Sequence, residues 1–155
     1  MPKTIIISAM SNNRVIGSGG GMPWNAPDEY QQYLSFVNGN AVIMGRRSFE
    51  IFGKDLKGTH NIVVSRSSFE MKDAIVCSSV DDALRKARLF DKTIFIAGGA
   101  TIYEQTIPLV DEMYLSYIKG SFQGDTYFPD FDINDWDIAK KEDKEAFEFV
   151  IYRRK

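Results

Sequence analysis

Short runs rich in isoleucine and valine alternate with segments of helical periodicity along most of this chain. The runs are too short to be buried helices, and they cover residues 4–10, 41–44, 61–64, 74–77, 93–97 and 113–118. Runs that are apolar at successive positions are typical of strands buried on both faces of a parallel sheet. The alternation therefore predicts an α/β fold with a mostly parallel sheet and right-handed crossovers.

The segments between these runs predict four helices. Apolar side chains in the first segment recur at i, i+3, i+4 and i+7, and Pro27 stands at an early helical position. Ser79 and Asp82 form a capping-box pattern at the start of the third. The helices are expected over residues 28–37, from about 46, over 80–89 and from about 100 to the break at Pro108.

The C-terminal part of the chain departs from this alternation. Residues 113–118 and 148–153 have the character of strands, and we expect only loop and turn residues between them. These two strands are expected to pair antiparallel, which makes the sheet mixed. The chain of 155 residues has no internal repeat or linker, so we expect a single domain over residues 1–155.

Composition excludes several classes of function. The 19 Lys and Arg residues are balanced by 21 Asp and Glu residues, so no net basic face for nucleic acid is expected. One cysteine, Cys77, and one histidine, His60, rule out an internal disulfide and argue against a zinc site or any other metal site. Cys77 ends an apolar run and is expected to be buried. No stretch is long and apolar enough for a membrane span, and we expect a cytoplasmic protein.

Three predicted strands end in residues suited to anions. One runs into Gly98-Gly99-Ala100, the second into Gly45-Arg46-Arg47-Ser48 and the third into Ser65-Arg66. Ligands of open α/β sheets bind beyond the carboxyl ends of strands, where helices begin and attract phosphate. Taken singly, the glycine pair could be a tight turn and the arginines a solvated corner. Together they predict a site for a dinucleotide with several phosphates.

The residue that follows the third strand indicates which dinucleotide this is. Sheets specific for NAD place an acidic residue there to hold the ribose 2′-hydroxyl, whereas Arg66 suits a 2′-phosphate. The sequence therefore predicts NADPH as the cofactor. The usual G-x-G-x-x-G motif is absent, so an ordinary Rossmann domain is not expected.

A glycine-rich segment and an acidic residue follow the first strand. Residues 15–24 contain four glycines in five positions beside Met22 and Trp24, which favours a mobile lid over a cleft. Glu29 lies in the first turn of the first predicted helix, where an acidic side chain is ordinarily explained by the helix dipole. The alternative is that Glu29 points into the cleft with a raised pKa while Asp28 faces solvent.

Six segments taken in order resemble the dihydrofolate reductase family along the whole chain. The resemblance implies a dihydrofolate-reductase-like fold with an eight-stranded mixed, mostly parallel sheet and four flanking helices. It also implies NADPH-dependent reduction of 7,8-dihydrofolate to tetrahydrofolate, binding of antifolate inhibitors, and a monomer. The segments are residues 13–17 (NRVIG), 22–29 (MPWNAPDE), 42–50 (VIMGRRSFE), 65–66 (SR), 97–103 (AGGATIY) and 124–129 (GDTYFP).

The same resemblance implies roles for individual residues. Glu29 would bind the pterin and assist protonation of its N5, Trp24 would hold a water beside it, and the turn at Gly124-Asp125 would latch the lid. The other substrate-binding residues would be Ile7, Ala9, Tyr30, Tyr33, Phe52, Leu56, Ala97, Tyr103 and Ser116, with Ser116 as the hydroxyl partner of Glu29. The cofactor-binding residues would be Ala9, Ile16, Gly17, Gly45, Arg46, Arg47, Ser48, Ser65, Arg66, Gly98, Gly99, Ala100, Thr101 and Ile102.

One position departs from the family pattern. Thr59 stands where the family has an arginine that clamps the glutamate of folate, and Lys57 or His60 are the nearby candidates to replace it. Two other functions stay open on the sequence. One is the pyrimidine reductase of riboflavin synthesis, which shares the fold and NADPH, and the other is a non-catalytic protein that binds pterin or NADPH.

Overall fold

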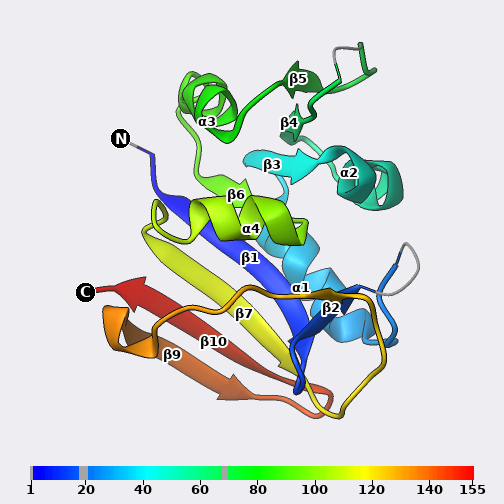
Figure 1. Cartoon of the computed structure of the whole chain (residues 1–155), viewed down its shortest axis with the longest axis vertical. Helices are drawn as coiled ribbons and strands as arrows, with labels where there is room; N and C mark the ends of the chain where they lie inside the picture. The colour runs from blue at the N-terminus through cyan, green and yellow to red at the C-terminus, as the bar shows by residue number, and fades with distance from the viewer. Residues whose placement is uncertain (1, 18–20, 68–69) are drawn as a thin grey trace.

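The computed structural model describes residues 2–17, 21–67 and 70–155. Eight strands form one sheet in the order β5-β4-β3-β6-β1-β7-β10-β9, and β2 and β8 form a separate two-stranded sheet (Figure 1). The strands are β1 (Thr4–Ser11), β2 (Val15–Gly17), β3 (Ala41–Gly45), β4 (His60–Val64), β5 (Ile75–Cys77), β6 (Ile94–Ile96), β7 (Glu112–Ile118), β8 (Thr126–Tyr127), β9 (Trp136–Asp143) and β10 (Phe147–Arg154). The helices are α1 (Pro27–Val37), α2 (Arg46–Phe52), α3 (Val80–Arg88) and α4 (Ala100–Thr106), with 3-10 turns η1 (Gly53–Asp55) and η2 (Ile133–Asp135).

The pairing pattern confirms the mostly parallel, mixed sheet. The strands from β5 to β7 in this order are all parallel to their neighbours. β10 runs antiparallel to β7, as expected for the two C-terminal strands. The Ser79 hydroxyl accepts a hydrogen bond from the backbone N–H of Asp82 at 3.1 Å, which confirms the cap at the start of α3.

The prediction that only loops and turns separate β7 from β10 is wrong. In the sequence, β8 and β9 come between them. In the sheet, β9 pairs with β10 and forms the edge strand, coloured orange in Figure 1. Most of its side chains, from Asp137 to Lys141, are exposed. An edge strand with so little burial has no apolar alternation, so its sequence resembles a loop and its pairing with β10 makes it a strand.

Successive side chains of the central strands enter two different cores. On one face Ile6, Ile43 and Ile96 pack with Leu84 of α3 and Ile102 of α4. On the other face a second set packs with residues of α1 and α2, and it contains Ile5, Ile7, Val42, Met44 and Phe95. Cys77 is 3% exposed, as predicted. Both faces of the sheet are therefore covered, which is why its strands are apolar at successive positions.

Candidate active site

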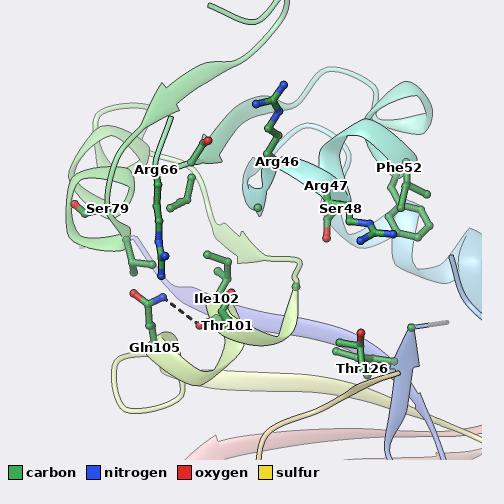
Figure 2. Close-up of a pocket in the computed structure, with 18 of the residues that line it drawn as sticks. Arg46, Arg47, Ser48, Phe52, Arg66, Ser79, Thr101, Ile102, Gln105 and Thr126 are labelled. Carbon is green, nitrogen blue, oxygen red and sulfur yellow. Dashed lines mark hydrogen bonds between the residues drawn. The ribbon is translucent and has the colours of Figure 1, made fainter. Parts of the chain in front are cut away.

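The carboxyl ends of β3, β4 and β6 open into one cavity of about 580 Å³ (Figure 2). Arg46, Arg47 and Ser48 enter it from the start of α2, and Ser65 and Arg66 from the end of β4. Thr101 and Ile102 of α4 form another wall. The three anion-suited segments therefore meet at one site, as the strand order requires.

The donors around this cavity fit a ligand with several phosphates. The described lining residues include three arginines but only one acidic residue, Asp125. They also include four serines, Ser48, Ser65, Ser78 and Ser79. Arg46 also forms an ion pair with Glu50, with Nε and Oε1 2.9 Å apart. Guanidinium and hydroxyl donors are the usual partners of phosphate oxygens, and the volume lies in the range of small-molecule sites. The cavity fits a phosphorylated dinucleotide such as NADPH.

Glycines bring the backbone close to the cavity. Gly98 has a φ of +111°, a conformation that favours glycine, and a Cβ there would lie 3.4 Å from both the Ser48 Oγ and the Tyr103 Oη. The backbone N–H of Gly45 donates to the carbonyl of Gly98 at 2.8 Å, which ties β3 to the start of α4. A side chain at Gly98 would therefore be strained and would crowd the wall that a ligand contacts.

A second, smaller cavity adjoins the first. The two cavities share four residues in their walls, Ile16, Ser48, Phe52 and Gly99. Most of the second lining is apolar or aromatic, and Glu29 is the one carboxylate among its described residues. The lining consists of Ile7, Ser8, Ala9, Ile16, Met22, Glu29, Tyr30, Tyr33, Met44, Ser48, Phe52, Ala97, Gly98, Gly99 and Tyr103.

Glu29 is the buried acid of this second cavity. It is 6% exposed in the first turn of α1, whereas the neighbouring Asp28 is exposed. Burial raises the pKa of the Glu29 carboxyl from its ordinary 4.5 to about 7, and the hydrogen bond from Ser116 opposes this rise. The cleft interpretation of Glu29 is therefore confirmed over the helix-dipole one. A group with this pKa can give or take a proton near neutral pH.

Four of the expected site residues lie outside the walls of the two cavities. Trp24 is 9% exposed, and its ring lies edge-on to Phe122 with centroids 5.8 Å apart. Ser116 lies behind Glu29 as its hydrogen-bond partner. Ala100 begins α4 without reaching the cavity, and Leu56 lines a third pocket. The other expected residues all line one of the two cavities.

Several lining residues were not expected from the sequence. Ser78, Ser79 and Val80 extend the first cavity from the turn between β5 and α3. The sequence contained a pattern that could have predicted them, because they follow a fourth predicted strand and begin a capped helix, which is where phosphate binds. Gln105 could not be predicted in this way, because it lines the cavity from the second turn of α4 and not from the end of a strand. The remaining additions are Ser8, Gly21, Met22, Met44, Ile51, Val64, Asp125 and Thr126.

The first part of the glycine-rich segment is a strand. Val15–Gly17 forms β2 and pairs with β8, so this end of the expected lid belongs to a two-stranded sheet. The Asp125 backbone N–H donates to the Gly17 carbonyl at 3.1 Å. Cross-strand pairing stabilises residues whose own composition does not favour a strand. Residues 18–20, the centre of the expected lid, lie outside the described residues.

Thr59 contacts its own neighbours at a third pocket. Its hydroxyl donates to the Asn61 Oδ1 at 2.7 Å, and the pocket also contains Lys54 and Lys72. The ring of His60 stacks on Phe90 with centroids 4.1 Å apart. Phe90 packs against the core, whereas Lys57 lines a separate groove between α1 and η1.

The described residues contain neither a candidate metal site nor a candidate membrane span. No group of three or more His, Cys, Asp or Glu side chains there could hold a metal ion. None of the described helices is long and apolar enough to cross a membrane.

A mixed α/β sheet with a cation-lined cavity beside an apolar one is typical of proteins that bind a phosphorylated dinucleotide. The family model described as dihydrofolate reductase matches residues 3–154. The chain belongs to the dihydrofolate reductase family, and its fold is the one expected from the sequence.

Individual relatives agree with this assignment. The chain is 36% identical to the dihydrofolate reductase of Haemophilus influenzae, with 97% of this chain and 98% of the relative covered. It is 34% identical to that of Bacillus subtilis, with 96% and 93% covered. The solved dihydrofolate reductase from Enterococcus faecalis, complexed with NADP(H) and RAB-propyl, superposes with a TM-score of 0.90 at 26% identity, covering 98% of this chain and 96% of that one.

Proposed function

We propose that this protein reduces 7,8-dihydrofolate to 5,6,7,8-tetrahydrofolate with NADPH. The observation that carries the proposal is the position of Glu29, a buried carboxyl with a pKa near 7 in an apolar cavity that adjoins a phosphate-suited one. The names of the relatives support this reading over the pyrimidine reductase and over a non-catalytic binding protein. An idle protein has no need for a carboxyl buried at such a cost.

The proposed roles divide between the two cavities. Arg46, Arg47 and Arg66, with the serines beside them, bind the phosphates of NADPH, and the glycines at 98 and 99 let its nicotinamide end approach β6. When bound, NADPH supplies the hydride for the pterin C6. Ala97, Tyr103 and the other apolar walls exclude water and orient the pterin ring, which is the part of catalysis that a protein contributes to cofactor chemistry.

Glu29 handles the proton in this proposal. Its carboxyl binds the 2-amino group and N3 of the pterin and assists the protonation of N5. Ser116 positions the carboxyl through its hydrogen bond. Trp24, a buried residue in the segment that connects β2 to α1, holds a water beside Glu29. A general acid is most effective when its pKa lies near the working pH, as it does here.

The partners and setting belong to the same proposal. The proposal includes a monomer of one domain. A single buried cysteine suits a reducing cytoplasm. Antifolates would occupy the cavity of Glu29, because a protonated nitrogen heterocycle forms a charge-assisted hydrogen bond with a carboxylate there.

Loss of NADPH absorbance with dihydrofolate as the sole acceptor tests the function. We expect steady oxidation of NADPH that depends on dihydrofolate, and formation of tetrahydrofolate in equal amount. The control offers the pyrimidine substrate of riboflavin synthesis in place of dihydrofolate. Turnover of that pyrimidine alone would overturn the proposal in favour of the pyrimidine reductase, and turnover of neither would favour a binding protein.

A further inference from the structure

A hydrogen bond joins α1 to η1 at the rim of the Glu29 cavity. The Tyr30 hydroxyl donates to the Asp55 Oδ2 at 2.5 Å. This length lies at the short end of the range for O–H···O hydrogen bonds. Burial and the neighbouring Asp55 both raise the pKa of Tyr30, which keeps the hydroxyl a donor at any physiological pH. Tyr30 therefore keeps the proton that it donates in this bond.

The two partners belong to different spaces. Tyr30 lines the inner cavity with Glu29, whereas Asp55 lines an outer groove between α1 and η1. The Tyr30 ring is held by Tyr33 and Phe52, with ring centroids 5.7 Å and 6.3 Å away. The Tyr30 ring lines the inner cavity, and its hydroxyl is bonded to a residue that lines the outer groove. The bond therefore lies between the inner cavity and the outer groove.

The outer groove differs in charge from the inner cavity. It measures about 470 Å³, and its lining includes two lysines, Lys54 and Lys57, together with Asp55. If the pterin ring occupies the inner cavity, a small substituent does not extend to the outer groove and leaves the bond intact. A pterin with a long substituent has to pass the bond to reach the groove, and an anionic substituent also has to pass the Asp55 charge.

We propose that the Tyr30–Asp55 hydrogen bond is a gate between the pterin cavity and the outer groove, which makes Tyr30 and Asp55 specificity-determining residues. The closed gate disfavours reduced pterins that carry a long anionic tail relative to reduced pterins with a short neutral substituent. This inference rests on the proposed function, because it assumes that a pterin ring occupies the cavity of Glu29.

Opening the gate requires free energy when the substrate binds and does not affect the hydride step. The bond lies at the rim, and a tail that has passed it contacts the groove alike before and during reaction. The free energy needed to open the gate therefore adds to KM for the tailed substrate and leaves kcat nearly unchanged, so a variant without the bond has a lower KM for that substrate. A residue with a purely structural role would change both substrates alike.

The test compares dihydrofolate with 6-hydroxymethyl-7,8-dihydropterin, which lacks the tail. Tyr30→Phe removes the hydroxyl and keeps the ring, and Asp55→Asn keeps an acceptor and removes the charge. Tyr117→Phe is the matched control, since Tyr117 is hydrogen-bonded to Tyr152 at 2.9 Å and lines neither space. The measured quantity is the ratio of kcat/KM for dihydrofolate over the tail-less pterin. This ratio does not depend on the fraction of protein that is folded.

We expect the ratio to rise about five- to tenfold in Tyr30→Phe, by a smaller factor in Asp55→Asn, and not in Tyr117→Phe, because a hydrogen bond to a charged group no longer has to be broken. Dissociation constants from quenching of tryptophan fluorescence give the same ratio without turnover. A ratio within about twofold of the unmodified protein in both rim variants overturns the gate. Failure of the unmodified protein to bind or reduce either pterin overturns the proposed function instead.

Discussion

Ser116 in the middle of β7 hydrogen-bonds the carboxyl of Glu29, which lies in the first turn of α1. β7 brings Ser116 alongside Ala9 of β1, and Ala9 lines the same cavity as Glu29. Two residues 87 positions apart in the sequence thus form one unit at the inner end of the site. Burial raises the pKa of the acid, and the hydroxyl limits the rise.

Glu29→Ala is expected to reduce kcat at pH 7 by about 10²–10⁴-fold, because it removes the group proposed to assist proton transfer. The dissociation constant of NADPH should stay close to that of the unmodified protein. Lower pH should restore part of the activity, since solvent then protonates the substrate. Asp28→Ala is the control, because that exposed neighbour has the same charge. Activity of Glu29→Ala within about threefold of the unmodified protein would exclude this role.

Ser116→Ala should move the pH profile of kcat/KM. The Ser116 hydrogen bond lowers the pKa of Glu29, so its removal raises that pKa further above 7. If the protonated acid is the active form, the decline of activity at high pH shifts upward by up to about one pH unit, the equivalent of one hydrogen bond. Ser121→Ala, at an exposed position, is the control. A shift to lower pH would contradict the assigned direction.

Arg66→Ala should narrow the preference for NADPH over NADH by about tenfold, because a charge-assisted contact with a phosphate is lost. Added salt should weaken the binding of NADPH more than that of NADH. Arg85→Ala provides the control, since Arg85 is exposed on α3 and pairs with Asp82 away from the cavity. Equal KM values for the two cofactors in the unmodified protein would show that Arg66 does not read the 2′-phosphate.

Lys57→Ala should raise KM for dihydrofolate about two- to fivefold, the range for an exposed ion pair, and leave KM for a tail-less pterin unchanged. Lys57 lines the outer groove, whereas Lys72 lines the pocket of Thr59. Lys72→Ala is therefore the matched comparison. The opposite pattern would place the glutamate tail in the Thr59 pocket, and Thr59→Arg would then be the variant that lowers KM.

Gly124→Ala should destabilise the fold by about 1–3 kcal/mol, the usual cost of overpacking. A Cβ at position 124 would lie 2.4 Å from both the Gly17 carbonyl oxygen and the Val15 Cγ1, so β2 has to move. Gly21→Ala is the control, because a Cβ there meets no atom within 4 Å. The free energy of unfolding from urea denaturation measures the difference. Equal stabilities would mean that the turn adapts without disturbing the β2–β8 pair.

The parallel strands and their helices could be predicted because the signal lies within each segment. Ile5, Ile6 and Ile7 are apolar in succession since the two faces of the sheet are both covered, and Ser79 caps α3 through a residue three positions away. The segments expected to bind the cofactor could also be predicted from the sequence. Glycine and arginine at the end of a buried strand are suited to binding phosphate whatever the position of that strand in the sheet. Local sequence thus determined the sheet, its helices and the phosphate-suited strand ends.

Other features depend on partners that are distant in the sequence. β9 is a strand because β10 pairs with it, although its own side chains are mostly exposed. Glu29 has the same first-turn pattern as any acid near a helix start. Only its burial raises its pKa to about 7, and the hydrogen bond from Ser116 opposes that rise. The Tyr30–Asp55 bond likewise requires α1 and η1 to meet. Tertiary packing alone decided these features, because desolvation and long-range hydrogen bonds are properties of the surroundings of a residue and not of its neighbours in the chain.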